Sequence, residues 1–144
     1  LAWAGLGSLA RQPHDLMYFN EWVGGPEQGW RWSVIGDDWG QDTAALGRWM
    51  ADRQLDWIYY DPYTEGDPER WGVRYRPTFG GQNLDEPGQP WVAVHVAMLV
   101  RFPEAYTFLA GKKPVETIGH TIFLYQLTPE EMRAARTAPP RKSF

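Results

Sequence analysis

Cysteine is absent from the 144-residue chain. The protein therefore has no disulfide, no thiolate metal ligand and no cysteine nucleophile. Basic residues are in the minority, because 14 Lys and Arg stand against 18 Asp and Glu and the formal net charge is −4. Since a surface that binds nucleic acid needs positive charge to contact phosphates, we expect no nucleic-acid partner.

The sequence motifs of several enzyme classes are missing as well. There is no Gly-x-Ser-x-Gly elbow, no phosphate-binding loop and no dinucleotide fingerprint, so we expect no cofactor. The histidines His14, His95 and His120 lack the short spacing of a zinc site, and we predict no metal centre. His95 lies in an apolar segment, where a buried structural histidine is more common than a catalytic one.

Aromatic residues, by contrast, are abundant, with nine Trp, seven Tyr and six Phe. Rings bury a large area each, so the simplest interpretation is an aromatic core. The alternative is that a few rings form a surface that stacks on sugars or lies near a membrane. A hydrophobic fraction of 43% excludes a disordered chain, and the length suits one domain.

The hydrophobic pattern predicts strands and helices in alternation. We expect strands at residues 30–35, 55–60, 91–101 and 115–127, the last one bent at Gly119, and a short edge strand at residues 73–75. Helices are expected at residues 39–54, 103–110 and 129–138. The order predicts an α/β layered sandwich with one mixed central sheet and helical crossovers. The short links near residues 72–79 leave room for an antiparallel edge.

Three acids, Asp37, Asp38 and Asp42, lie around the expected start of the first helix. Asp38 with Gln41 three residues later fits a capping box, and acids in a first turn oppose the helix dipole. The alternative is a cation site or a pair of reacting carboxylates. The spacing favours Asp38 as the cap of a helix that begins at Trp39.

Several stretches of the chain resemble a known family when they are taken in order. They are Tyr18-Phe19-Asn20-Glu21, Gly24-Gly25-Pro26, Asp38-Trp39-Gly40-Gln41-Asp42, Asp67-Pro68, Trp71-Gly72-Val73, Pro114-Val115, Ile118-Gly119 and Ile122-Phe123. The combination, over residues 13–127, resembles the C-terminal soluble portion of bacterial family-39-type membrane glycosyltransferases, which are relatives of protein mannosyltransferases.

The resemblance implies a parent enzyme with many membrane helices that transfers a sugar from a polyprenyl-phosphate carrier. Its catalytic acid would lie in the membrane portion. Residues 1–12 would then be a linker or the end of a membrane helix, residues 13–128 an extracytoplasmic domain, and residues 129–144 a polar helix and tail. The implied partners are the membrane portion of the same polypeptide and a glycan, protein or lipid acceptor.

Three functions follow from these observations. The first is a non-catalytic accessory domain that shapes the acceptor path of the transferase. The second is a glycan-binding module that uses exposed aromatic rings, and the third is a hydrolase that uses Asp38 and Asp42 in one open cleft. Clustered exposed Trp residues would favour the binding module, whereas Trp residues spread through the core would favour the accessory domain.

Ligands of open α/β sheets bind beyond the carboxyl ends of strands, where helices begin. We therefore expect a set of polar and aromatic residues to converge there and to face acceptor or glycan. The alternative is that they tie the N-terminal segment to the sheet through buried hydrogen bonds. The set consists of Tyr18, Asn20, Glu21, Trp39, Gln41, Asp42 and His95.

Overall fold

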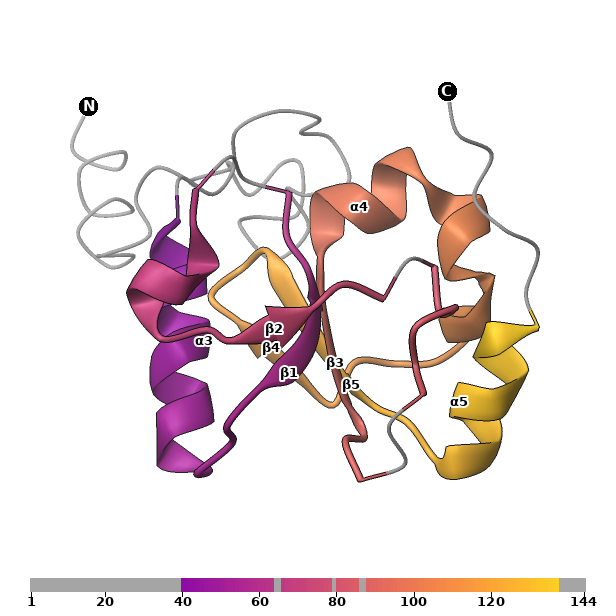
Figure 1. Ribbon diagram of the computed structural model, residues 1–144. Helices are drawn as coiled ribbons and strands as arrows, with labels where there is room; N and C mark the ends of the chain where they lie inside the picture. Colours follow the sequence, from indigo (N-terminus) through magenta and orange to yellow (C-terminus); the bar gives the residue numbers. More distant parts are fainter. Residues whose placement is uncertain (1–39, 64–65, 79, 86–87, 138–144) are drawn as a thin grey trace, which may run out of the picture.

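The computed structural model describes residues 40–63, 66–78, 80–85 and 88–137. Within these ranges the chain forms a five-stranded sheet in the order β2-β1-β3-β5-β4 (Figure 1). The strands are β1 (Ile58–Asp61), β2 (Tyr75–Arg76), β3 (Trp91–His95), β4 (Glu116–Ile118) and β5 (Ile122–Gln126). The expected strand at residues 30–35 lies outside the described residues.

The sheet is mixed, as the sequence predicted. Strand β1 runs parallel to both β2 and β3, whereas β5 runs antiparallel to both β3 and β4. The expected antiparallel edge near residues 72–79 is wrong, because the 3₁₀ helix η3 (Pro68–Trp71) carries the chain back so that β2 runs parallel to β1. The antiparallel edge is at the opposite side, in the β4–β5 hairpin.

Helices cover both faces of the sheet and complete an α/β layered sandwich (Figure 1). On one face, α3 (Gln41–Asp52) packs Leu46, Trp49 and Met50 against the sheet. The other face is covered by α4 (Val96–Arg101), the 3₁₀ helix η4 (Pro103–Leu109) and α5 (Pro129–Arg136). Alternate residues of each strand pack against the helices on the two faces, since the side chains of a strand point to opposite faces of the sheet. No helix of the described ranges is long and apolar enough to span a membrane.

Two of the expected strands are interrupted, the first after His95 and the second at residues 119–121, where a bend at Gly119 is expected. The strand expected at residues 91–101 ends at His95, and α4 begins at Val96 because the His95 ring accepts a hydrogen bond from the Ala97 amide at 3.2 Å and caps the helix. The strand expected at residues 115–127 is a hairpin. Its turn includes Gly119, whose φ of +57° lies in the left-handed region that favours glycine.

The first helix also begins later than expected. Helix α3 starts at Gln41, and its N-cap position is occupied by Gly40 with φ +102°, so the expectation of Asp38 as the cap of a helix from Trp39 is wrong. A residue at this positive φ cannot be part of a right-handed helix. Asp38 and Trp39 themselves lie outside the described residues.

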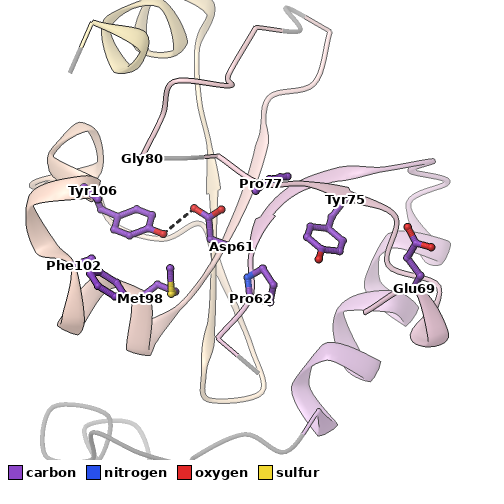
Figure 2. A pocket seen from close by; sticks show the side chains of 10 residues that line it. Asp61, Pro62, Glu69, Tyr75, Pro77, Gly80, Met98, Phe102 and Tyr106 are labelled. Atoms are coloured by element: carbon purple, nitrogen blue, oxygen red, sulfur yellow. Dashed lines mark hydrogen bonds between the residues drawn. The ribbon is translucent and has the colours of Figure 1, made fainter. Parts of the chain in front are cut away.

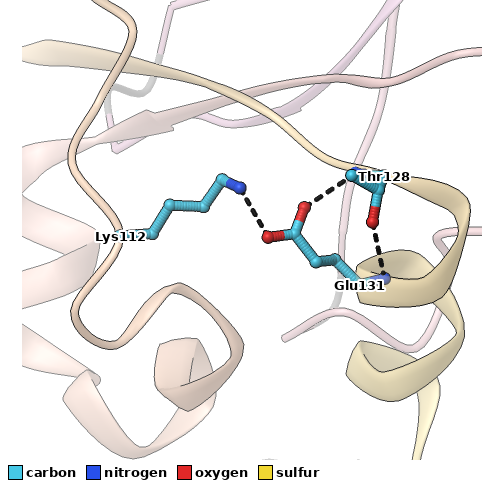
Figure 3. Close-up of polar contacts among 3 residues, drawn as sticks. All are labelled: Lys112, Thr128 and Glu131. Carbon is cyan, nitrogen blue, oxygen red and sulfur yellow. Dashed lines mark hydrogen bonds and ion pairs between the residues drawn. The ribbon is translucent and has the colours of Figure 1, made fainter.

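Helix α5, and not α3, begins with a capping box. The Thr128 hydroxyl accepts from the Glu131 amide at 3.2 Å, and the Glu131 carboxylate accepts from the Thr128 amide at 2.7 Å (Figure 3). The Lys112 ammonium donates to the same carboxylate at 2.6 Å, and these donors hold the pKa of Glu131 below its usual value. The helix is thereby joined to the segment that follows η4.

Helix α3 packs closely against the end of η3 at Gly47. A Cβ atom on Gly47 would lie well inside contact distance of the Trp71 carbonyl oxygen. Gly47→Ala should therefore lower the free energy of unfolding by about 1–3 kcal/mol, although Ala is otherwise the better helix former. Urea unfolding measures this, with Arg48→Ala on the exposed side of the same helix as control. A higher midpoint for Gly47→Ala would contradict the packing.

Candidate functional site

Asp42, in the first turn of α3, is completely buried against the β4–β5 turn. Its Oδ2 accepts three hydrogen bonds, from the His120 amide at 2.9 Å, the Thr121 amide at 3.0 Å and the Thr121 hydroxyl at 2.7 Å. We call Asp42 together with residues 119–121 the Asp42 junction. It joins segments that are 78 and 79 positions apart in the chain.

Gly119 allows the Asp42 carboxylate to approach the backbone of the β4–β5 turn closely. A Cβ atom there would overlap the Asp42 carboxylate, and the φ of +57° independently disfavours any side chain. The carboxylate is therefore pressed against bare backbone. With 0% exposure and three accepted hydrogen bonds, the arrangement is that of a structural hydrogen-bond acceptor.

The junction extends to the end of β3. The Thr121 carbonyl accepts from the Val96 amide at 2.7 Å, and Ile122 pairs with His95 in the sheet. His95 is 2% exposed, and this burial lowers its pKa from 6.5 to about 4, although the charge of Asp42 acts in the opposite direction. The ring is therefore neutral at pH 7, and because Nδ1 accepts from the Ala97 amide, its proton is on Nε2.

The expected convergence of functional residues can be followed for three of its members. Asp42 and His95 lie on two sides of the same turn, and Gln41 is partly buried at the start of α3. The burial and pairing of Asp42 fit the alternative in which it serves as scaffold. The other members of the set lie outside the described residues: Tyr18, Asn20, Glu21 and Trp39. Asp37 and Asp38 lie outside them as well. Among the described residues, no group of three or more His, Asp or Glu is placed to hold a metal ion.

A second polar site was not recognised in the sequence. Asp61, at the carboxyl end of β1, is 6% exposed. Its Oδ1 accepts from the Thr78 amide at 2.8 Å, and its Oδ2 accepts from the Tyr106 hydroxyl at 2.8 Å and from the Thr78 hydroxyl. Asp61 directly follows the strand expected at residues 55–60. The one available signal was its position at a strand end.

Asp61 lies in the wall of a pocket of about 450 Å³, which we call the strand-end pocket (Figure 2). Figure 2 shows Tyr106, Met98 and Phe102 on one side of it and Tyr75 with Glu69 on the other. Its lining residues are Asp61, Pro62, Glu69, Tyr75, Pro77, Gly80, Met98, Phe102, Ala105 and Tyr106. Among the described residues, the lining thus contains two carboxylates and no Lys, Arg or His.

Comparison of the chain with models of known protein families, with curated proteins and with solved structures finds no match. The function is therefore proposed from the residues and geometry described above.

Removal of the Asp42 carboxylate should destabilise the fold strongly. Asp42→Ala leaves the donors of His120 and Thr121 without their acceptor, and we expect the free energy of unfolding to fall by roughly 2–4 kcal/mol. Chemical unfolding measures the change, and Asp52→Ala, at the exposed end of the same helix, is the matched control. Equal effects of the two substitutions would argue against the Asp42 junction.

His95 should make the protein less stable in mild acid. Its folded-state pKa of about 4 is below the unfolded value of 6.5, so the unfolded chain takes up a proton first as the pH falls. The stabilisation is complete above pH 6.5 and is lost as the pH falls toward 4. Between pH 7 and 4.5 the wild type should lose about 2 kcal/mol more than His95→Asn, which keeps a capping acceptor but does not titrate. Urea unfolding at several pH values measures this; parallel profiles for the two proteins would contradict it.

Proposed function

We propose that this chain is a non-catalytic accessory domain of a polyprenyl-phosphate-sugar-dependent membrane glycosyltransferase. It would lie on the extracytoplasmic face, beside the membrane portion of the same polypeptide. Its role there is to shape the path of the acceptor. The sequence resemblance described above suggests this function, and the packing of the resembling stretches supports it.

The observation that carries the proposal is that stretches of the resemblance contact one another. Asp42 belongs to Asp38-Trp39-Gly40-Gln41-Asp42, and its carboxylate is in contact with the backbone around Gly119, from Ile118-Gly119. A third stretch, Trp71-Gly72-Val73, passes close to Gly47 of α3. Residues that are shared because they hold one fold together are expected to meet in this way.

Two of the described stretches also have local structural roles, at the two ends of η3. The Asp67 side chain accepts from the Glu69 amide at 3.1 Å and caps η3, which starts with Pro68. Gly72 ends the same 3₁₀ helix with φ +78°. A fragment whose resembling residues build a scaffold fits an accessory domain better than a catalytic one.

The hydrolase alternative depends on Asp42 as one of two carboxylates in an open cleft. A general acid or base must reach the proton that it transfers, and a nucleophile must reach the reacting atom. Asp42 is 0% exposed and accepts three protein hydrogen bonds. Its geometry therefore weighs against this alternative.

The described Trp residues weigh against a binding module that uses clustered exposed rings. Trp49 is buried, contacts Trp91 edge to face at a centroid distance of 5.1 Å, and donates to Glu116 at 2.8 Å. Trp57 is half-buried, and Trp71 is 54% exposed. Of the four described Trp residues only Trp71 is exposed, so they form no exposed cluster, and this favours the accessory domain.

The isolated chain should show no sugar transfer. We would assay it with a polyprenyl-phosphate sugar and peptide or lipid acceptors and expect the product to stay at background, because the proposal assigns the catalytic acid to the membrane portion. Turnover above background that is lost in Asp61→Asn, with the fold intact by circular dichroism, would contradict a non-catalytic role. In the full-length parent, removal of this domain should reduce transfer to its normal acceptor.

A further inference from the structure

The strand-end pocket is at the place where ligands of α/β sheets usually bind. Strands β1 and β2 are parallel, and their carboxyl ends contribute Asp61 and Pro62 from one strand and Pro77 from the other. The chain then supplies the opposite wall from α4 and η4, with Met98, Phe102 and Tyr106. A site beyond the carboxyl ends of adjacent parallel strands is the common arrangement in this class of fold.

The buried carboxylate of the pocket, that of Asp61, is held in place before any ligand arrives. Asp61 is fixed by Thr78, 17 positions later, and by Tyr106, 45 positions later. A carboxylate has about four acceptor positions, and these described residues occupy three, so one remains for a ligand donor. A group that is already oriented loses little freedom on binding, which favours affinity.

The charge of the pocket selects against anionic ligands. Two carboxylates, Asp61 and Glu69, contribute to the lining, and none of the lining residues that the structure describes is basic. A phosphate or carboxylate group would meet like charge there, at an energetic cost in a partly desolvated site. Ligand groups that donate hydrogen bonds are favoured.

The rest of the lining is apolar or aromatic. Tyr75 is half-buried on the edge strand β2, with its ring edge to face against Tyr60 at a centroid distance of 5.8 Å. Met98 and Phe102, both half-buried, line the other side. An aromatic face beside carboxylate acceptors is complementary to a ring that has hydroxyl donors on its edge and C–H groups on its face. The volume of about 450 Å³ is within the usual range for small-molecule sites.

We propose that the strand-end pocket binds an uncharged sugar ring, with Asp61 and Glu69 accepting from its hydroxyls and Tyr75 contacting its C–H face. The assignment of that sugar to the acceptor, rather than to an unrelated glycan, rests on the proposed function. The binding itself rests only on the charge, shape and aromatic lining of the pocket.

The test is a titration of the ¹⁵N-labelled 144-residue chain with the methyl glycosides of glucose, galactose and mannose, followed by amide chemical shifts. At least one glycoside should shift amides near Asp61, Tyr75 and Tyr106. Tyr75→Leu should weaken its binding roughly five- to tenfold, and Glu69→Gln, an exposed position, about fivefold. The matched control is Glu104→Gln, an exposed acid on η4 outside the lining, which should bind like wild type.

Charged probes complete the test. Glucuronate should bind more weakly than the neutral glycosides, because it adds an anion to an acidic pocket. No shift at the pocket with any neutral glycoside, tighter binding of glucuronate, or tighter binding of ethylammonium would each overturn the proposal, the last one in favour of a cationic ligand. If Tyr75→Leu is misfolded, Glu69→Gln alone decides the role of the lining.

The outcome for the pocket and the outcome for the accessory role are separable. If the glycosides do not bind but removal of the domain still reduces transfer in the parent, the pocket proposal fails and the accessory function stands. If the glycosides bind but the parent transfers normally without the domain, the accessory function fails and the pocket proposal stands.

Discussion

The burial of one carboxylate, that of Asp42, is the constraint on which the rest of the structure depends. An acidic group without solvent access is tolerated only where protein donors replace water. Here the donors come from the β4–β5 turn, almost 80 positions away, so helix α3 and the hairpin are fixed relative to each other. The Val96 amide bonds to the carbonyl of Thr121 in the same turn, and the end of β3 is held as well.

Asp61 uses the same physical device with a different result. It is also an almost buried carboxylate with three protein hydrogen bonds, and its donors also come from distant segments. The difference lies in the space around it. Gly119 brings bare backbone up to Asp42 and closes that site, whereas Asp61 lies in the wall of the strand-end pocket. One acid therefore serves stability, and the other is placed where it can contact a ligand. This division fits a domain that holds an acceptor but performs no chemistry on it.

The sequence was most informative where the pattern was local and long. The helical spacing of Leu46, Trp49 and Met50 indicates α3, and the α/β class follows from the order of elements. The end of β3 was missed because Val96 and the apolar residues after it suit a strand as well as a helix, and only the His95 cap decides between them. The partners of Asp61 could not be predicted, because Thr78 and Tyr106 approach it only through tertiary packing.

Asp42 acts as scaffold through its contact with the β4–β5 turn, and a double-mutant cycle measures that contact most directly. Asp42→Ala and Thr121→Val, singly and together, would be unfolded in urea. Because the two side chains hydrogen-bond at 2.7 Å, we expect their effects to be non-additive, with a coupling of about 1 kcal/mol or more. Strictly additive effects would mean that the contact does not hold α3 to the hairpin, and would contradict the scaffold role.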